Sequence, residues 1–121
     1  MVDETEILTP EKVERKLYHL SLAIDKAHKE LSAAEKDYLE KKADLEIALA
    51  KSRIKNSHPD MRMTASLRED QALIENEQES RALAIAEIVV RASRANVKRL
   101  ETQVDIARSL GTSVRASMEV I

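Results

Sequence analysis

Five basic side chains stand close together in the middle of this 121-residue chain, where they could bind phosphate groups. They lie between residues 47 and 68, a segment with one acidic residue, Asp60, and they are Lys51, Arg53, Lys55, Arg62 and Arg68. Lysine and arginine attract the phosphate backbone of nucleic acids without regard to base sequence. The alternative interpretation is that they are ordinary surface charges, which keep a helix solvated and pair with nearby acids.

A second basic group lies toward the C-terminus, where residues 88–121 carry six basic and three acidic side chains. Spacings of three, four and seven residues place side chains on one face of a helix. The candidates for nucleic-acid contact that share such faces are Arg91, Arg94 and Lys98, then Arg108 and Arg115. Several copies of the chain would present these weak patches together and bind more tightly. The alternative is pairing with Glu87, Glu101 and Asp105, which needs no ligand.

Residues that could catalyse a reaction or hold a metal ion lack the required partners in the sequence. The three histidines, His19, His28 and His58, share no metal-binding spacing, and the chain has no cysteine. A single glycine cannot build a glycine-rich phosphate loop, and no serine stands beside a signature that would activate it as a nucleophile. The sequence therefore predicts a protein that is not an enzyme, with no catalytic residue, metal site or cofactor.

Aromatic side chains, which stack on unpaired bases, are scarce. The chain has no Phe or Trp, and its two tyrosines, Tyr18 and Tyr38, are expected on or near the apolar seam described next. The sequence also lacks a short helix-turn-helix pattern that would fit a DNA groove. Any binding of DNA is therefore expected to be electrostatic and independent of base sequence.

A long first helix is predicted over about residues 10–55. Thr9 can cap its first free amides, Pro10 suits the first helical position, and Glu11 suits the first turn. Apolar residues then recur every three or four positions, as in a coiled coil. This first seam consists of Leu17, Leu20, Ile24, Ala27, Leu31, Ala34, Tyr38, Leu45, Ala48 and Ser52. Turn formers from Asn56 onward end the helix and open a turn over about 56–64.

A second helix is predicted over about residues 65–110, with Thr64 or Ser66 as its cap. Its seam consists of Ala86, Val90, Ser93, Val97, Leu100, Val104 and Ala107. If the chain folds back near residue 60, position 24 faces 97 and position 17 faces 104, so the two seams meet. We therefore expect an all-α fold of one domain, a long antiparallel helical hairpin with coiled-coil-like seams. An N-terminal extension over 1–9 precedes it, and a C-terminal tail over 111–121 follows the second helix.

Apolar side chains outside the two seams indicate a homo-oligomer. Ile88 and Val89 extend beyond the face that the seam occupies, and Val114, Met118 and Ile121 lie beyond the start of the first helix. We expect a second copy of the chain to cover these five residues. The alternative is a monomer in which the first eight residues fold over the tail.

Composition also bears on the compartment in which the chain works. Its 20 basic and 22 acidic residues give a formal charge of −2, which neither requires nor excludes a polyanionic partner. The absence of cysteine suits a reducing compartment, and no apolar run approaches the roughly 18 residues that a membrane span needs. The sequence thus predicts a cytoplasmic protein without a membrane partner.

The C-terminal stretch, residues 104–120, contains Val104-Asp105-Ile106, then Arg108-Ser109-Leu110-Gly111, and then Val114-Arg115 followed by Met118. In these residues the chain resembles the UvsY family of phage recombination mediators. A similar layout begins near Leu17, where an apolar and basic first helix precedes a polar turn. The sequence departs from the family in its acidic run, residues 69–79, and in its poorer aromatic content.

The resemblance implies a small helical protein that assembles into a ring and binds single-stranded DNA nonspecifically. Such a protein helps a recombinase to displace single-strand-binding protein during DNA recombination, replication and repair, in the host cytoplasm if it is phage-encoded. Carried over by position, Arg108 and Arg115 become DNA-contact or assembly residues, and Val114 and Met118 become oligomer contacts. The competing expectation is a non-enzymatic coiled-coil scaffold or chaperone of phage morphogenesis, which binds a partner protein and needs no DNA.

Overall fold

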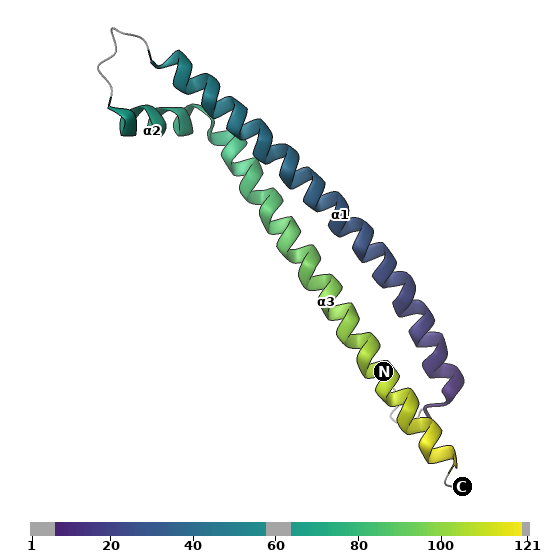
Figure 1. Ribbon diagram of the computed structural model, residues 1–121. Coiled ribbons are helices and arrows are strands. Elements are labelled where there is room, and N and C mark those ends of the chain that lie inside the picture. The colour runs from purple at the N-terminus through teal and green to yellow at the C-terminus, as the bar shows by residue number, and fades with distance from the viewer. Residues whose placement is uncertain (1–6, 58–63, 120–121) are drawn as a thin grey trace. The chain divides into compact units, whose positions relative to one another are not determined.

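The computed structural model describes residues 7–57 and 64–119, and their secondary structure is helical, with no strand among them. The elements are α1 (Pro10–Lys55), α2 (Ala65–Glu75) and α3 (Glu77–Glu119), shown in Figure 1. The all-α expectation is therefore confirmed. Several predictions fall outside the described residues: the contacts assigned to Arg62 and Ile121, and the turn residues 58–63.

The ends of α1 follow from local hydrogen bonds. At its start, the Thr9 hydroxyl accepts from the Lys12 amide at 3.3 Å, while the Thr9 carbonyl accepts from the Val13 amide at 3.1 Å. At its end, the Ser57 hydroxyl donates to the Ile54 carbonyl at 2.7 Å and satisfies one of the last free acceptors. Arg53 and Lys55 stand in the last turn, where positive charge offsets the helix dipole.

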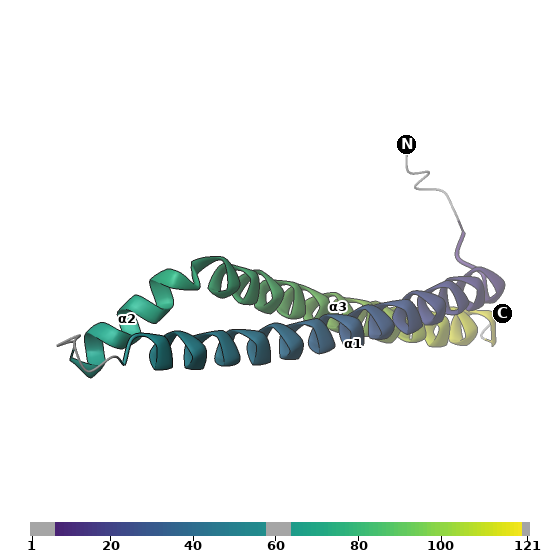
Figure 2. The same ribbon diagram turned by 90° about the horizontal axis from the view of Figure 1, so that it is seen from above.

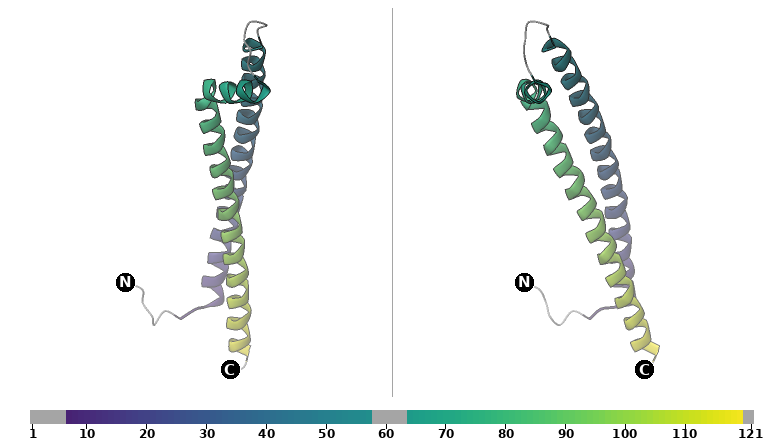
Figure 3. Two further views of the ribbon diagram at one scale, coloured as in Figure 1. Left: turned by 90° about the vertical axis from the view of Figure 1, so that its left-hand side faces the viewer. Right: turned by 60° about the vertical axis from the view of Figure 1, so that its left-hand side comes forward.

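The second predicted helix, expected to be continuous over about 65–110, is interrupted at Asn76. Thr64 caps α2 by accepting from the Leu67 amide at 3.2 Å. At the other end, Asn76 has φ −115° and ψ 33°, and its carboxamide donates to the Ala72 carbonyl at 2.8 Å. That side chain takes over a carbonyl of the last turn of α2, so α3 starts in a new direction. Figures 2 and 3 show α2 bent away from the first turns of α3.

The predicted C-terminal tail over 111–121 is helical to Glu119, which corrects the expectation that the helix ends near residue 110. Glycine is common at the ends of helices, but Gly111 lies inside α3. In the structure, a Cβ atom at Gly111 would stand 3.0 Å from Cγ1 of Val13. Glycine is therefore accommodated inside α3 because it lets two helices approach closely, at a cost of about 1 kcal/mol in helix propensity.

The chain divides into two compact units. The terminal unit consists of residues 1–30 and 94–121, and the middle unit consists of residues 31–93. In the terminal unit, the buried apolar side chains are Val13, Leu20 and Ala27 of α1 and Val97, Leu100 and Ala107 of α3. In the middle unit they are Leu45 of α1, Ala72 of α2, and Ala86 and Val90 of α3. Every residue named in the two predicted seams is buried or half-buried, whereas the buried residues Val13 and Ala72 belong to neither seam.

Within each unit, α1 and α3 run antiparallel, but their register differs from the expected one. In the terminal unit Val13 lies against Gly111, whereas a fold-back at residue 60 would place residue 108 there. In the middle unit the Ser52 hydroxyl accepts from the carboxamide of Asn76 at 2.8 Å, where residue 69 was expected. In the middle unit the register differs because the helix is interrupted at Asn76. The 11 residues of α2 therefore run in another direction and do not extend α3.

Substitution of Gly111 by leucine tests the close approach of the helices in the terminal unit. The new side chain must displace Val13, so we expect the free energy of unfolding to fall by about 1–3 kcal/mol despite the better helix propensity of leucine. Thermal unfolding followed by circular dichroism measures this change. Ser109→Leu, at an exposed position of α3, is the matched control. Equal or greater stability of Gly111→Leu would contradict the close contact.

Candidate nucleic-acid interface

The basic cluster predicted from residues 47–68 lies at the end of α1 and on α2, in the middle unit. Lys51, Arg53 and Lys55 are exposed, and Arg68 of α2 is half-buried. Within residues 7–57 and 64–119, none of the first three forms a salt bridge within 4.0 Å. The Nε atom of Arg68 is buried and makes no hydrogen bond with the described part of the chain.

Two of these cations share a hollow of about 450 Å³. It is lined by Lys51, Ser52 and Lys55 of α1, by Glu75 at the end of α2, and by Asn76. Lys51 and Lys55 stand one turn apart on one face of α1, whereas Arg53 lies on a different face. The structure therefore brings together two members of the predicted cluster and separates the third.

A network of hydrogen bonds holds the walls of this hollow. The Asn76 carboxamide donates to the Ser52 hydroxyl at 2.8 Å, which ties the break between α2 and α3 to α1. The Asn56 carboxamide donates to Oε1 of Glu75 at 3.5 Å, and the Gln71 carboxamide donates to the same oxygen at 3.3 Å. Asn56 is only 6% exposed and is therefore buried, whereas its partner Glu75 is exposed. The lysines thus stand on a fixed frame.

The carboxylate of Glu75 modifies the charge of the hollow. Its pKa is lowered from the ordinary value of 4.5, chiefly by the hydrogen bond from Gln71, then by Ser52 and Asn56 and by attraction to Lys55, while desolvation opposes the shift. Glu75 is therefore ionised at neutral pH and offsets one of the two ammonium charges. A phosphate entering the hollow competes with this carboxylate for Lys55.

The predicted basic residues of α3 are divided between the two units. In the middle unit, Arg91 bonds to Glu87 at 2.7 Å. In the terminal unit, Arg115 pairs with Glu14 of α1 at 3.5 Å. Arg91 thus pairs with one of the three acids that the alternative interpretation named, whereas the partner of Arg115 is not among those three. Lys98, Arg94 and Arg108, all in the terminal unit, are exposed.

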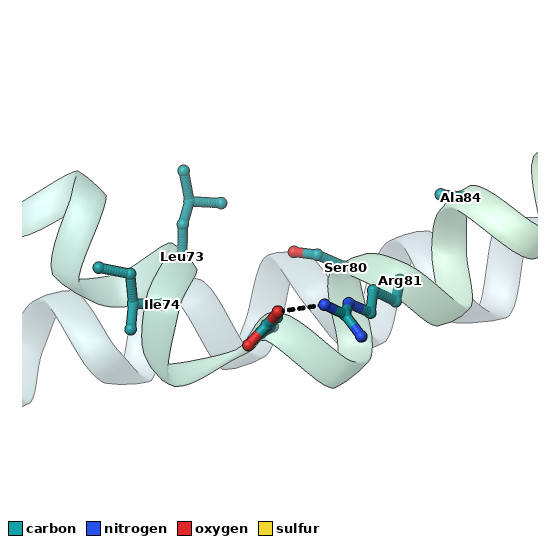
Figure 4. Close-up of a pocket in the computed structure, with 6 residues that line it drawn as sticks. Leu73, Ile74, Ser80, Arg81 and Ala84 are labelled. Atoms are coloured by element: carbon teal, nitrogen blue, oxygen red, sulfur yellow. Dashed lines mark hydrogen bonds and ion pairs between the residues drawn. The ribbon is translucent and has the colours of Figure 1, made fainter.

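The apolar residues assigned to an oligomer interface differ in exposure. Ile88 and Val89 of the middle unit are 64% and 47% exposed, and Met118 of the terminal unit is 59% exposed. Val114 is half-buried. The middle unit has a further apolar hollow beside the break, lined by Leu73, Ile74, Ser80 and Ala84 with the Glu77–Arg81 ion pair, as Figure 4 shows. Sequence reasoning missed this hollow, because it depends on the bend between α2 and α3.

One aromatic residue lies elsewhere than expected. Tyr18 was placed on or near the seam, but it is 61% exposed, whereas Tyr38 is half-buried. Tyr18 directly follows Leu17, and one step along a helix turns a side chain by about 100°, which carries it off the seam. The basic residues that accompany Tyr18 on the outside of α1 were also missed, and their helical spacing was the signal that would have found them.

The structure gives two further findings about kinds of site. Among the described residues, no three His, Cys, Asp or Glu side chains gather as they would around a metal ion. No helix in the same residues has the length and apolar character needed to cross a membrane.

Comparisons with protein-family models, with curated proteins and with solved structures find no match to this chain.

Substitution of Glu75 by glutamine tests the frame of the hollow. Because the pKa of Glu75 is lowered in the folded state, the ionised carboxylate stabilises the fold above pH 4.5, and this contribution is lost as the pH falls through the lowered pKa. We expect Glu75→Gln to lower the melting temperature at neutral pH and to match the wild type in acid. Gln71→Ala should reduce the same pH-dependent difference. A difference that does not change with pH would contradict this role of Glu75.

Proposed function

We propose that this protein is a non-enzymatic accessory protein of DNA recombination that binds single-stranded DNA through its phosphate backbone. The observation that carries the proposal is the hollow at the end of α1, where Lys51 and Lys55 stand one turn apart without a salt bridge among the described residues. Two ammonium groups at this spacing suit neighbouring phosphate oxygens. Arg53 and Arg68 add positive charge in the same unit, and Arg94, Lys98 and Arg108 add it in the terminal unit.

Binding of this kind depends on charge and has little base specificity. Each phosphate neutralised on a single strand lowers the logarithm of the affinity by about 0.7 for every tenfold increase in salt. Two lysines therefore give a slope of roughly −1.4 per copy of the hollow. The modest contribution of one copy is the reason to expect several copies to act together.

In this proposal the chain forms a homo-oligomer and transfers DNA to a recombinase. A homo-oligomer would align several hollows along one strand, help to displace single-strand-binding protein, and assist a recombinase in loading. The exposed Ile88, Val89 and Met118 side chains support the oligomer, because apolar surface of this kind is usually covered. The chemistry of strand exchange would belong to the recombinase.

A scaffold or chaperone function is the second candidate, and a separate observation favours it. The outer side of α1 in the middle unit carries an apolar row of Leu39, Ile47 and Ile54, which are 61%, 55% and 75% exposed. Such a row could receive the apolar face of a partner helix without any DNA.

Charge reversal in the hollow tests the DNA proposal. We expect Lys51→Glu with Lys55→Glu to weaken binding of a labelled single strand at least tenfold at low salt and to make the salt slope shallower by about 1 to 2, because two phosphate contacts are lost. Fluorescence anisotropy at several salt concentrations measures both changes. Lys42→Glu, an exposed lysine of α1 in the same unit, is the matched control. Failure of the wild type to bind at low salt would remove the DNA function and favour the scaffold.

The oligomer is tested separately by introducing charge at its predicted contacts. We expect Val114→Asp with Met118→Asp to reduce the mass of the particle in solution, since carboxylates at an apolar contact oppose association. Light scattering coupled to size-exclusion chromatography measures this mass. Thr112→Asp, at an exposed position of α3, is the control for added charge. An unchanged mass of the double variant would exclude these residues from the interface.

A further inference from the structure

The outer face of α1 in the terminal unit gathers all the basic residues of that part of the helix. Between Pro10 and Glu30 these residues are Lys12, Arg15, Lys16, Lys26 and Lys29, and all five are exposed. With 3.6 residues in each turn, they fall within an arc of about 140° around the helix axis. The buried residues Val13, Leu20 and Ala27 lie outside this arc, about 20° to 60° beyond Lys16 around the helix. We call the side that carries the five cations the outer face.

Two of the acidic residues of this segment, Glu11 and Glu30, fall within the arc that holds the five cations. Glu14 lies outside the arc and pairs with Arg115 of α3 at 3.5 Å, and Asp25 also falls outside it. Glu30 lies within the arc and approaches Lys26 at 4.0 Å, a long contact between exposed groups that is worth little. Glu11 stands in the first turn, where it interacts with the helix dipole. The outer face is therefore basic although the whole chain has a formal charge of −2.

An aromatic ring stands at the edge of the outer face. Tyr18 is 61% exposed, and Leu22 one turn further along is 50% exposed. The ring of Tyr18 meets the ring of His19 edge to face, with centroids 5.8 Å apart and planes at 62°. The exposed surface of the Tyr18 ring is available to a ligand that stacks on it.

We propose that the outer face binds single-stranded DNA, with one base stacked on Tyr18 and neighbouring phosphates held by Arg15, Lys26 and Lys29. The inference rests on the proposed DNA binding, but it assigns a second contact in the other unit. An aromatic ring among cations is the combination that proteins use to hold single strands. From Arg15 to Lys29 the helix rises about 21 Å, which is long enough to follow several nucleotides.

The chemistry of the outer face selects a single strand over other anionic partners. In a duplex the bases are stacked on one another, so no base face is free for Tyr18, and phosphate contacts alone remain. A lipid surface would require a wide apolar face on the helix. Here Tyr18 and Leu22 are flanked by charged residues within one turn on either side.

Tyrosine fluorescence provides the direct measurement, because the chain has two tyrosines and no tryptophan. In the Tyr38→Phe variant all tyrosine emission comes from Tyr18. We expect unlabelled oligothymidylate to quench this emission over the same concentration range in which anisotropy reports binding of the labelled strand. A duplex of equal length should quench much less. Full binding by anisotropy with unchanged Tyr18 emission would overturn the stacking contact while leaving the proposed function intact.

Affinity measurements on full-length variants complete the test. We expect Tyr18→Ala to weaken binding of oligothymidylate at least fivefold, whereas Tyr18→Phe keeps the wild-type affinity because the stacking ring remains. Arg15→Glu with Lys29→Glu should weaken binding at least tenfold and make the salt slope shallower by about 1. Circular dichroism confirms that each variant stays helical.

The matched control is Lys36→Glu, which changes an exposed lysine of α1 in the middle unit and should leave the affinity nearly unchanged. An equal loss in this control would mean that total charge, and not the outer face, determines binding, and would overturn the proposal. Wild-type affinity of the Tyr18→Ala variant for oligothymidylate would also overturn the proposal. The proposal would be overturned as well if phosphatidylglycerol vesicles, and not oligothymidylate, quenched Tyr18, because the outer face would then be a lipid contact.

Discussion

Each unit of this protein is built around one narrow apolar seam, and the remaining features follow from that constraint. A seam of one row of side chains per helix buries small residues such as Ala27, Ala86 and Ala107 nearly completely and leaves most other side chains in water. Little apolar surface is removed from water per residue, so close approach of the helices matters more than in a thick core. Gly111 against Val13 is the clearest consequence, because it permits contact at the expense of helix propensity.

A seam with a heptad-like repeat does not by itself fix which residues face each other. Shifting one helix by seven residues would again bring apolar side chains together, as it does in coiled coils. Polar contacts remove this ambiguity in the middle unit. Asn76 has its hydrogen-bond partner on Ser52, and Asn56 is buried beside Glu75, so a shifted register would leave these groups unpaired. The same contacts hold Lys51 and Lys55 beside one hollow, so the groups that set the register also position the candidate site.

The sequence was sufficient for features that depend on near neighbours along the chain. The start of α1 at Pro10 follows from the Thr9 cap, and the seam residues follow from their spacing. Features that depend on residues distant in the sequence could not be predicted from it. Asn76 stands in a polar run without Pro or Gly, so nothing local distinguished a break from a continuing helix. Gly111 carried the usual signal of a helix end, and its true role depends on Val13, which is far away in sequence.

The candidate site shows the same division between local and distant information. Charge counts located basic segments, and pairs four residues apart such as Arg91 with Glu87 follow from helical spacing, but a pair between two helices depends on residues that are distant in sequence. Arg115 flanks the seam and reaches Glu14 across it, whereas Arg15 and Lys29 lie on the far side of α1, away from the other helix. A chain with nearly balanced charge can therefore present basic faces, because its acids are distributed differently around each helix. Position around the helix, and not net charge, decides which of its 20 basic residues can contact a polyanion.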